Sequence, residues 1–208
     1  MTSYSFVDGE YEIRSEIKRS VFIATVKGEV DGDGAEEFVR AVRKRYPDAT
    51  HNCYAYISDE LGNVTRFSDD GEPGGTAGQP ILDVLKKQGL VKTAVVVTRY
   101  FGGIKLGAGG LVSAYSGAAA DAVRAATVSR KIECNKIEVV ASYSHFAMID
   151  KYIRNSRCKI ENIEYDDNVK AMLFVPVEEV DAFADIICEL TAGRATVTVL
   201  GGTYYEKL

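Results

Sequence analysis

The hydrophobic and polar positions of the first 130 residues alternate between the period of a strand and the period of a helix. Short runs rich in β-branched and aromatic residues predict strands, and they lie at 19–27, 50–57, 63–68 and 93–98. Apolar residues at helical spacing predict helices over 34–46, 78–89 and 108–127. The segment at 93–98, TAVVVT, is continuous and β-branched, which is typical of a buried strand.

The pattern changes after the helix predicted to end near residue 127. Strands and amphipathic helices are predicted in the order β-α-β-β-α-β, at 132–143, 145–156, 158–165, 169–176, 178–190 and 195–200. This order fits a split βαβ, ferredoxin-like domain. We therefore expect an α+β protein with two domains, residues 1–130 and residues 131–208.

Composition and charge exclude several classes of protein. The chain has 208 residues, of which 46% are hydrophobic and 26% charged, as in an ordinary globular protein. The 25 Lys and Arg against 30 Asp and Glu give a net charge of −5, so no basic coat for nucleic acid covers the molecule and no DNA partner is expected. A local basic site stays open. The acidic excess lies mainly in residues 131–208, with 9 basic and 13 acidic side chains.

Targeting segments and metal-binding patterns are not seen in the sequence. It has no run of about 18 apolar residues and no apolar signal region at its start, so we expect a cytoplasmic protein with no membrane partner. The four cysteines form no C-x-x-C pair and are interpreted as reduced thiols. With two histidines in the chain, neither a metal site nor a resident cofactor is expected.

Glycine clusters at 69–80 and at 99–110. The second cluster leads into the predicted helix at 108–127, and a helix N-terminus after glycines presents free N–H groups to an anion. Walker and Rossmann patterns fail here, because Ala108 and Val112 stand where they need lysine and glycine. Tight turns and helix–sheet packing are an equally weighted alternative for these glycines. The candidate phosphate-binding residues are Arg99, Gly102, Gly103, Lys105, Gly107, Gly109 and Gly110.

The first glycine cluster carries carboxylates. Asp69, Asp70 and Glu72 precede the candidate binding residues Gly74, Gly75 and Thr76. Loop carboxylates bind Mg²⁺ or act as an acid–base pair, which makes Asp70 and Glu72 candidate catalytic residues. A solvated turn that caps the next helix is the alternative, and we favour it.

A third set of candidate residues lies upstream of both glycine clusters. Lys18, Arg19 and Ser20 form a short polar segment, and His51 and Cys53 are two residues apart on a predicted strand. A His–Cys pair suggests nucleophilic catalysis. No orienting partner is identified, so a partly buried strand histidine is the favoured interpretation.

The two glycine clusters also carry a resemblance. S-D-D-G-E-P-G-G-T-A-G-Q-P at 68–80 and V-V-V-T-R-Y-F-G-G-I-K-L-G-A-G-G-L-V-S-A-Y at 95–115 closely resemble the signature of the IMPACT family, whose bacterial members are called YigZ-like. K-R-S-V-F-I at 18–23 and H-N-C-Y-A-Y at 51–56 fit the same pattern. The resemblance implies a first domain like the second domain of ribosomal protein S5, a β-sheet with helices on one side. It implies a second domain like the ferredoxin-like modules of elongation factor G.

Two functional hypotheses follow. The resemblance implies control of translation and stress or amino-acid-starvation signalling, and hence a regulatory protein that binds RNA, the ribosome or a translation factor through the glycine-rich loops. A basic rim of Lys18, Arg19, Arg66, Arg99 and Lys105 would assist. The alternative is an enzyme acting on a phosphorylated small molecule or nucleotide, because S5-like folds are shared with small-molecule kinases. There the amides of 107–110 would hold phosphate, and Asp70 or Glu72 would bind Mg²⁺ or take a proton.

Both hypotheses make the same structural prediction. The loops 69–80 and 99–110 are expected to lie side by side and to form one pocket or groove.

Overall fold

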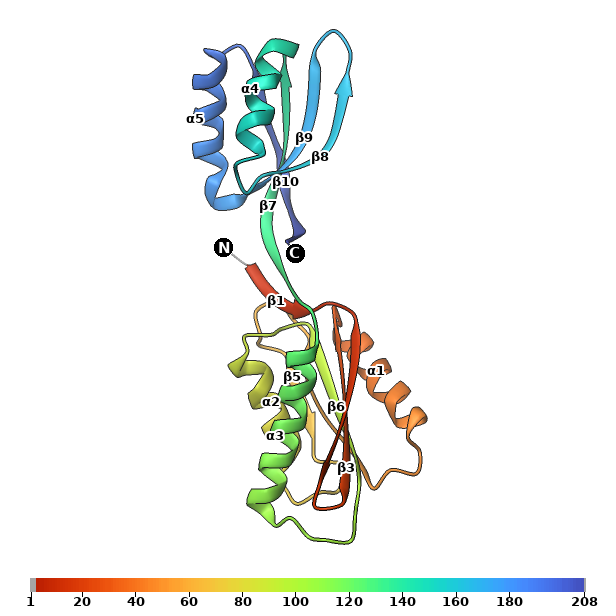
Figure 1. Cartoon of the computed structure of the whole chain (residues 1–208). Helices are drawn as coiled ribbons and strands as arrows, with labels where there is room; N and C mark the ends of the chain where they lie inside the picture. Colours follow the sequence, from red (N-terminus) through yellow and green to blue (C-terminus); the bar gives the residue numbers. More distant parts are fainter. Residues whose placement is uncertain (1–2, 208) are drawn as a thin grey trace. The chain divides into compact units, whose positions relative to one another are not determined.

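A computed structural model describes residues 3–207, which fold into two compact units. The first unit is Tyr4–Arg130, and the second contains the chain from Lys131 onward. Figure 1 shows their helices and strands. The elements up to residue 125 are β1 (Ser3–Val7), β2 (Glu10–Ile17), β3 (Ser20–Gly28), α1 (Gly32–Arg45), β4 (His51–Ile57), β5 (Thr65–Ser68), α2 (Gly78–Lys87), β6 (Thr93–Tyr100) and α3 (Ala108–Ala125).

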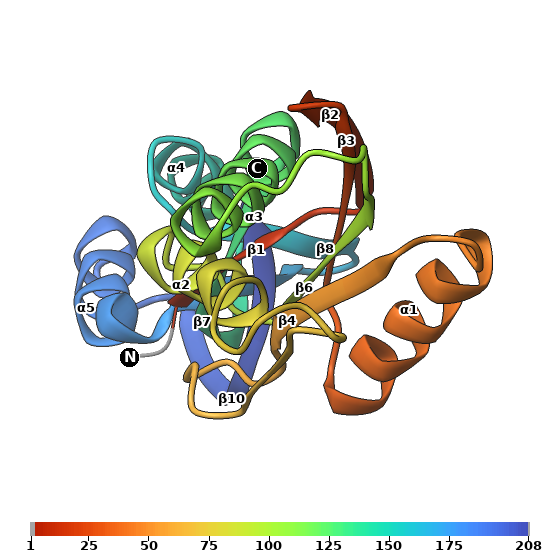
Figure 2. The same ribbon diagram turned by 90° about the horizontal axis from the view of Figure 1, so that it is seen from below.

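The first unit is built on an antiparallel sheet with the strand order β2-β3-β6-β4-β5. Helices α2 and α3 cover one face of it, where they pack on Phe22, Ala55 and Val97. Helix α1 covers the other face, as Figures 1 and 2 show. It packs on the sheet through Phe38 and its neighbours on the helix.

The expectation of helices on one side of this sheet is therefore wrong. Every residue of β6 from Thr93 to Arg99 is buried. Side chains of a strand point alternately to the two faces, so a continuously apolar strand needs cover on both. Val95 and Val97 meet α2 and α3, whereas Ala94 and Val96 meet α1.

The sequence patterns did not predict β1 or β2. Strand β2 alternates half-buried and exposed positions along EYEIRSEI, at the edge of the sheet. A two-residue turn at Lys18 and Arg19 joins it to β3, and both residues have positive φ, 47° and 65°. Tight hairpin turns with this backbone shape usually carry Gly or Asn, so the ordinary sequence signal of a hairpin was missing.

The second unit has the predicted order β-α-β-β-α-β. Its strands follow the order β10-β7-β9-β8. Apolar residues of both helices, among them Phe146 and Phe183, pack on the sheet residues Ile137 and Leu173. The elements are β7 (Val128–Ala141), α4 (Tyr143–Ile153), β8 (Lys159–Tyr165), β9 (Val169–Pro176), a 3₁₀ turn (Val177–Glu179), α5 (Val180–Thr191) and β10 (Thr196–Lys207).

In the part of the chain described by the structure, none of the helices has both the length and the apolar character needed to span a membrane.

Candidate functional site

Three segments distant in sequence meet at one end of the first unit's sheet. The Lys18–Arg19 turn packs directly against Gly102, because a Cβ on Gly102 would lie 2.0 Å from the carbonyl carbon and oxygen of Arg19. The buried hydroxyl of Ser20 accepts a hydrogen bond of 3.2 Å from the Gly102 N–H. Glycine is therefore required at 102 by close backbone approach.

The two glycine-rich loops meet at a buried ion pair. Arg99 Nη1 lies 2.5 Å from Glu72 Oε1, and the two side chains are 6% and 4% exposed. The same oxygen accepts a hydrogen bond of 2.7 Å from the Tyr115 hydroxyl and lies 3.8 Å from His51 Nε2. Glu72 thus joins both loops, β4 and α3 in one cluster, which we call the Glu72 cluster (Glu72, Arg99, Tyr115 and His51).

Arg99 is enclosed by aromatic rings as well as by Glu72. Its guanidinium carbon lies 5.5 Å from the ring centroids of both Phe22 and Phe101. Among the described residues its Nε has no hydrogen-bond partner. Arg99 is buried and its charge is balanced by Glu72, so its place on an exposed basic rim is corrected.

A pocket of about 350 Å³ opens beside the Glu72 cluster. Glu72 and Pro73 from the first loop face Lys105 and Gly107 from the second. The prediction that the loops 69–80 and 99–110 lie side by side and share one pocket is therefore confirmed. We call this the glycine pocket; its lining consists of Glu72, Pro73, Arg99, Phe101, Lys105, Leu106, Gly107, Ala108 and Leu111.

Helix α3 starts at the wall of the glycine pocket with no side-chain cap. Gly107, at φ 74°, precedes it. Within the described residues, the N–H groups of Ala108, Gly109 and Gly110 donate to no protein acceptor. A Cβ on Gly109 would meet nothing within 4 Å. The first turn of α3 therefore offers free donors and the positive end of its dipole to an anion.

The carboxylates of the first loop have structural partners. Asp69 accepts hydrogen bonds from the backbone N–H groups of Gly75, Ala77 and Gly78, at 2.8–3.0 Å, and so holds the loop that enters α2. Thr76 belongs to the same loop and donates to the Pro73 carbonyl. The favoured interpretation, a turn that caps the next helix, holds for Asp69.

Asp70 is held in the same way. One oxygen accepts from Arg43 at 2.6 Å and the other from the Asn52 N–H at 2.6 Å. Together with the ion-paired Glu72, this leaves none of the three carboxylates without protein donors. Among the described residues, no group of three or more His, Cys, Asp and Glu side chains is arranged to hold a metal. The residues present do not fit Mg²⁺.

Replacing Asp69 by alanine is expected to lower the free energy of unfolding by about 2 kcal/mol, the upper range for a lost helix cap. Burial opposes the charged form of Asp69, but its three backbone donors outweigh burial and hold the pKa of the carboxyl below its usual value. The stabilisation of the folded state by the charged Asp69 carboxylate is therefore present above about pH 4, the usual pKa of an aspartate. It is lost as the pH falls through the lowered folded pKa. Urea unfolding of both proteins from neutral to acid pH measures this; a constant difference would contradict it.

His51 and Cys53 serve the same loop. His51 Nδ1 lies 2.7 Å from the Asp70 carbonyl oxygen, and the Cys53 thiol donates to the Asp69 carbonyl at 2.9 Å. Cys53 is fully buried, and burial raises the pKa of its thiol to about 12. A thiol with this pKa is a poor nucleophile at neutral pH, which supports the non-catalytic interpretation of this pair.

Three residues of the predicted basic rim are exposed at the site. Lys105 lies in the second glycine loop, and Lys18 and Arg19 form the turn that packs against Gly102 of that loop. Arg66 lies elsewhere, in a pocket beside α1. The sequence reasoning missed Tyr115 and Phe101, which lie on the Glu72 cluster and in the glycine pocket. Tyr115 follows Leu111 by one helical turn on the buried face of α3, and this spacing alone indicated a core residue rather than a hydrogen-bond donor.

Comparisons with known proteins cover both units. Residues 18–123 match the Impact N-terminal domain, and residues 139–194 match a domain of unknown function (DUF1949). The chain is 39% identical over 199 residues to "IMPACT family member YvyE" of Bacillus subtilis, with 96% of this chain and 91% of that protein aligned. It is 36% identical over 200 residues to "IMPACT family member YigZ" of Escherichia coli, covering 93% and 96%.

A solved structure titled "Crystal structure of an hypothetical protein" is also similar. Its TM-score is 0.61 at 32% identity, and the match covers 96% of this chain and 98% of that one.

Proposed function

Because the chain belongs to the IMPACT family, we propose that it is a translation-associated regulatory protein that binds RNA, on the ribosome, through the glycine pocket. The translational role follows from what the family resemblance implies. The binding mode is supported by one observation above the others: the uncapped first turn of α3 faces a pocket that also presents Lys105.

The chemistry of the glycine pocket suits one nucleotide of a single-stranded RNA. A phosphate at the first turn of α3 would accept from the free N–H groups of Ala108, Gly109 and Gly110. Phe101 is 47% exposed, although Arg99 lies 5.5 Å from its ring centroid. Exposed aromatic side chains stack bases without regard to sequence. Binding would then be salt-dependent and tolerant of sequence.

We also propose the finer fold assignments: S5 domain 2-like for the first unit's sheet with α2 and α3, with α1 on the other face, and ferredoxin-like for the second unit. Support for the second assignment comes from its order β-α-β-β-α-β and from the strand order β10-β7-β9-β8.

The enzymatic alternative uses the same pocket but needs a carboxylate that binds Mg²⁺ or takes a proton. Asp70 and Glu72 are held by donors from Arg43, Asn52, Arg99 and Tyr115, which leaves them poorly placed for either role. Nucleotide with Mg²⁺ that raises the melting temperature of the protein would favour the enzyme; a flat response would not.

The test is a charge placed in the proposed phosphate position. Gly109→Asp puts a carboxylate in the first turn of α3, where acidic residues favour the helix, and no atom lies within 4 Å of the added Cβ. RNA of about 12 nucleotides, a length within known single-strand site sizes, is titrated by fluorescence anisotropy at several salt concentrations. We expect Gly109→Asp to abolish binding while the melting temperature is kept.

Two further measurements complete this test. Lys86→Gln, on the exposed end of α2 and outside the glycine pocket, makes the net charge more negative by the same single unit as Gly109→Asp and is the control for that change. In sucrose gradients of lysate, the wild-type protein is expected to migrate with ribosomal particles at low salt and to leave them as the salt rises. Equal RNA affinity of Gly109→Asp and wild type, at equal salt dependence, would contradict binding at this pocket.

A further inference from the structure

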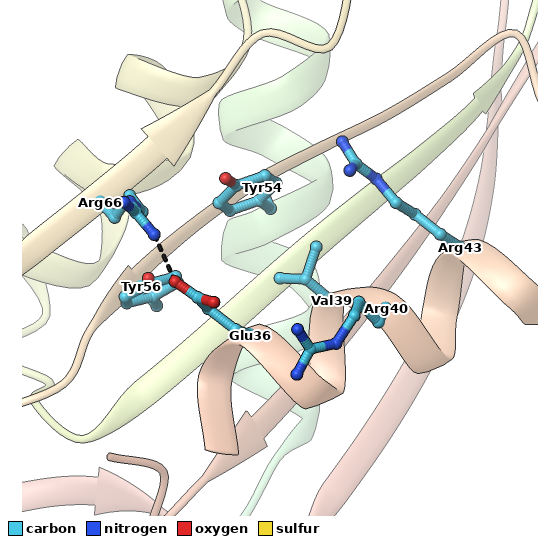
Figure 3. Close-up of a pocket in the computed structure, with 7 residues that line it drawn as sticks. All are labelled: Glu36, Val39, Arg40, Arg43, Tyr54, Tyr56 and Arg66. Atoms are coloured by element: carbon cyan, nitrogen blue, oxygen red, sulfur yellow. Dashed lines mark hydrogen bonds and ion pairs between the residues drawn. The ribbon is translucent and has the colours of Figure 1, made fainter. Parts of the chain in front are cut away.

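A second pocket, which we call the α1 groove, lies on the other face of the first unit's sheet from α2 and α3. Its volume is about 170 Å³, too small for a whole nucleotide but sufficient for one small anionic group. Figure 3 shows the side chains that line it, which come from α1, β4 and β5: Glu36, Val39, Arg40, Arg43, Tyr54, Tyr56 and Arg66.

The ring faces of the two tyrosines in the α1 groove are already covered. Tyr54 and Tyr56 stack on each other with centroids 6.1 Å apart and planes 11° apart. The guanidinium of Arg43 lies 5.6 Å from the Tyr54 ring centroid, and Tyr56 is only 4% exposed. The groove therefore offers guanidinium and hydroxyl donors rather than a free face for base stacking.

In the described part of the chain, two of the three arginines in the α1 groove form ion pairs with carboxylates, and the third does not. Arg66 forms an ion pair with Glu36, and Arg43 forms one of 2.6 Å with Asp70. Arg40 is exposed and, among the described residues, lies within ion-pair distance of no carboxylate. One guanidinium thus remains to attract an anion, with a second and a third beside it. A guanidinium binds the oxygens of phosphate in a bidentate manner.

We propose that the α1 groove binds a second phosphate group of the RNA strand that occupies the glycine pocket. The proposal rests on the proposed function. The Arg43–Asp70 ion pair ties the groove to the segment 69–72, and Glu72 of that segment lines the glycine pocket. A single strand that passes over this segment meets phosphate donors on both sides of it.

The link between the α1 groove and the glycine pocket through the segment 69–72 favours RNA over a phosphorylated protein as the source of the phosphate. A phosphorylated side chain would present one phosphate and would need no second site. A nucleic-acid strand presents phosphates at regular intervals, so two anion sites on either side of the segment 69–72 suit it better.

The test compares Arg40→Gln with Lys86→Gln, since each removes one exposed positive charge from a helix, on opposite faces of the sheet. The probe is a mixed-sequence single-stranded RNA of about 12 nucleotides, titrated between about 50 and 200 mM salt. Arg40→Gln is expected to weaken binding several-fold at low salt and to reduce the slope of log K against log salt by about 0.7, the value for one lost phosphate contact. Lys86→Gln is expected to change neither, and both variants keep the wild-type melting temperature.

The outcomes separate this inference from the proposed function. If Gly109→Asp abolishes RNA binding and Arg40→Gln equals Lys86→Gln, the α1 groove proposal is overturned and the proposed function stands. If the wild-type protein does not bind RNA, both are overturned. If Arg40→Gln leaves RNA binding unchanged but abolishes binding of a phosphoserine peptide, the groove serves a protein and the RNA assignment is overturned.

Discussion

Replacing Glu72 by glutamine is expected to lower the free energy of unfolding by about 3–5 kcal/mol, the range for removing one partner of a buried ion pair. Glutamine keeps the shape of the side chain and an acceptor for the Tyr115 hydroxyl, but it leaves the charge of Arg99 unbalanced. The Arg99 side chain is 6% exposed and lies between two aromatic rings, so it has little access to water. Urea unfolding, followed by circular dichroism, measures the loss.

A double variant is the control for this prediction. Glu72→Gln with Arg99→Met removes both charges and keeps the long side chain under Phe22 and Phe101. Replacing both partners of a buried ion pair by neutral side chains destabilises a protein far less than removing one partner. The double variant is therefore expected to recover part of the stability that Glu72→Gln loses. A loss of less than 1 kcal/mol for Glu72→Gln, the value typical of an exposed pair, would show that water reaches the pair in solution.

Gly102→Ala is expected to disrupt the site at a second place. Its Cβ would lie 2.0 Å from the Arg19 carbonyl and 2.5 Å from the Ser20 nitrogen, and both are backbone atoms. The Lys18–Arg19 turn must therefore move away from the second glycine loop, and the bond from the Gly102 N–H to the Ser20 hydroxyl breaks. We expect a loss of about 3 kcal/mol, the upper range for an overfilled site, measured by thermal and urea unfolding.

Gly109→Ala is the matched control for Gly102→Ala. It adds the same methyl group to the same loop–helix segment, but nothing lies within 4 Å of it. Alanine in place of a helical glycine stabilises by about 0.5–1 kcal/mol, so this variant is expected to melt at or above the wild-type temperature. If the two variants had equal stabilities, the close packing of Gly102 on Arg19 would not persist in solution.

Most elements of the fold were predictable from their sequence patterns, but β2 and the second helical layer were not predicted. All seven strands and helices predicted between 19 and 127 are present, with ends shifted by at most two residues. β2 was missed although EYEIRSEI alternates with the two-residue period of a half-buried strand. Its hairpin turn gave no second signal, because Lys18 and Arg19 stand where glycine or asparagine is usual. The second helical layer was missed although the apolar run at 93–98 required it.

Within the candidate site, the meeting of the segments was predictable but the roles of their charges were not. The glycine clusters and the Ser20 segment do converge. A sequence does not show which charges neutralise each other, so Arg99 and Glu72 were candidates for contact with a ligand and instead face one another. Asp69 was open to two interpretations because a capping carboxylate and a metal-binding one look the same until their donors are known.

The register of the central sheet also has a consequence for how the protein forms. Strand β3 pairs with β6, so that Val21 lies opposite Tyr100, and α1, β4, β5 and α2 all intervene. Pairings between such distant strands require a large loop to close first, which makes folding slow. During synthesis the sheet stays incomplete until β6 has emerged, and the glycine pocket additionally waits for α3. A nascent chain therefore acquires the glycine pocket only when nearly the whole first unit has left the exit tunnel.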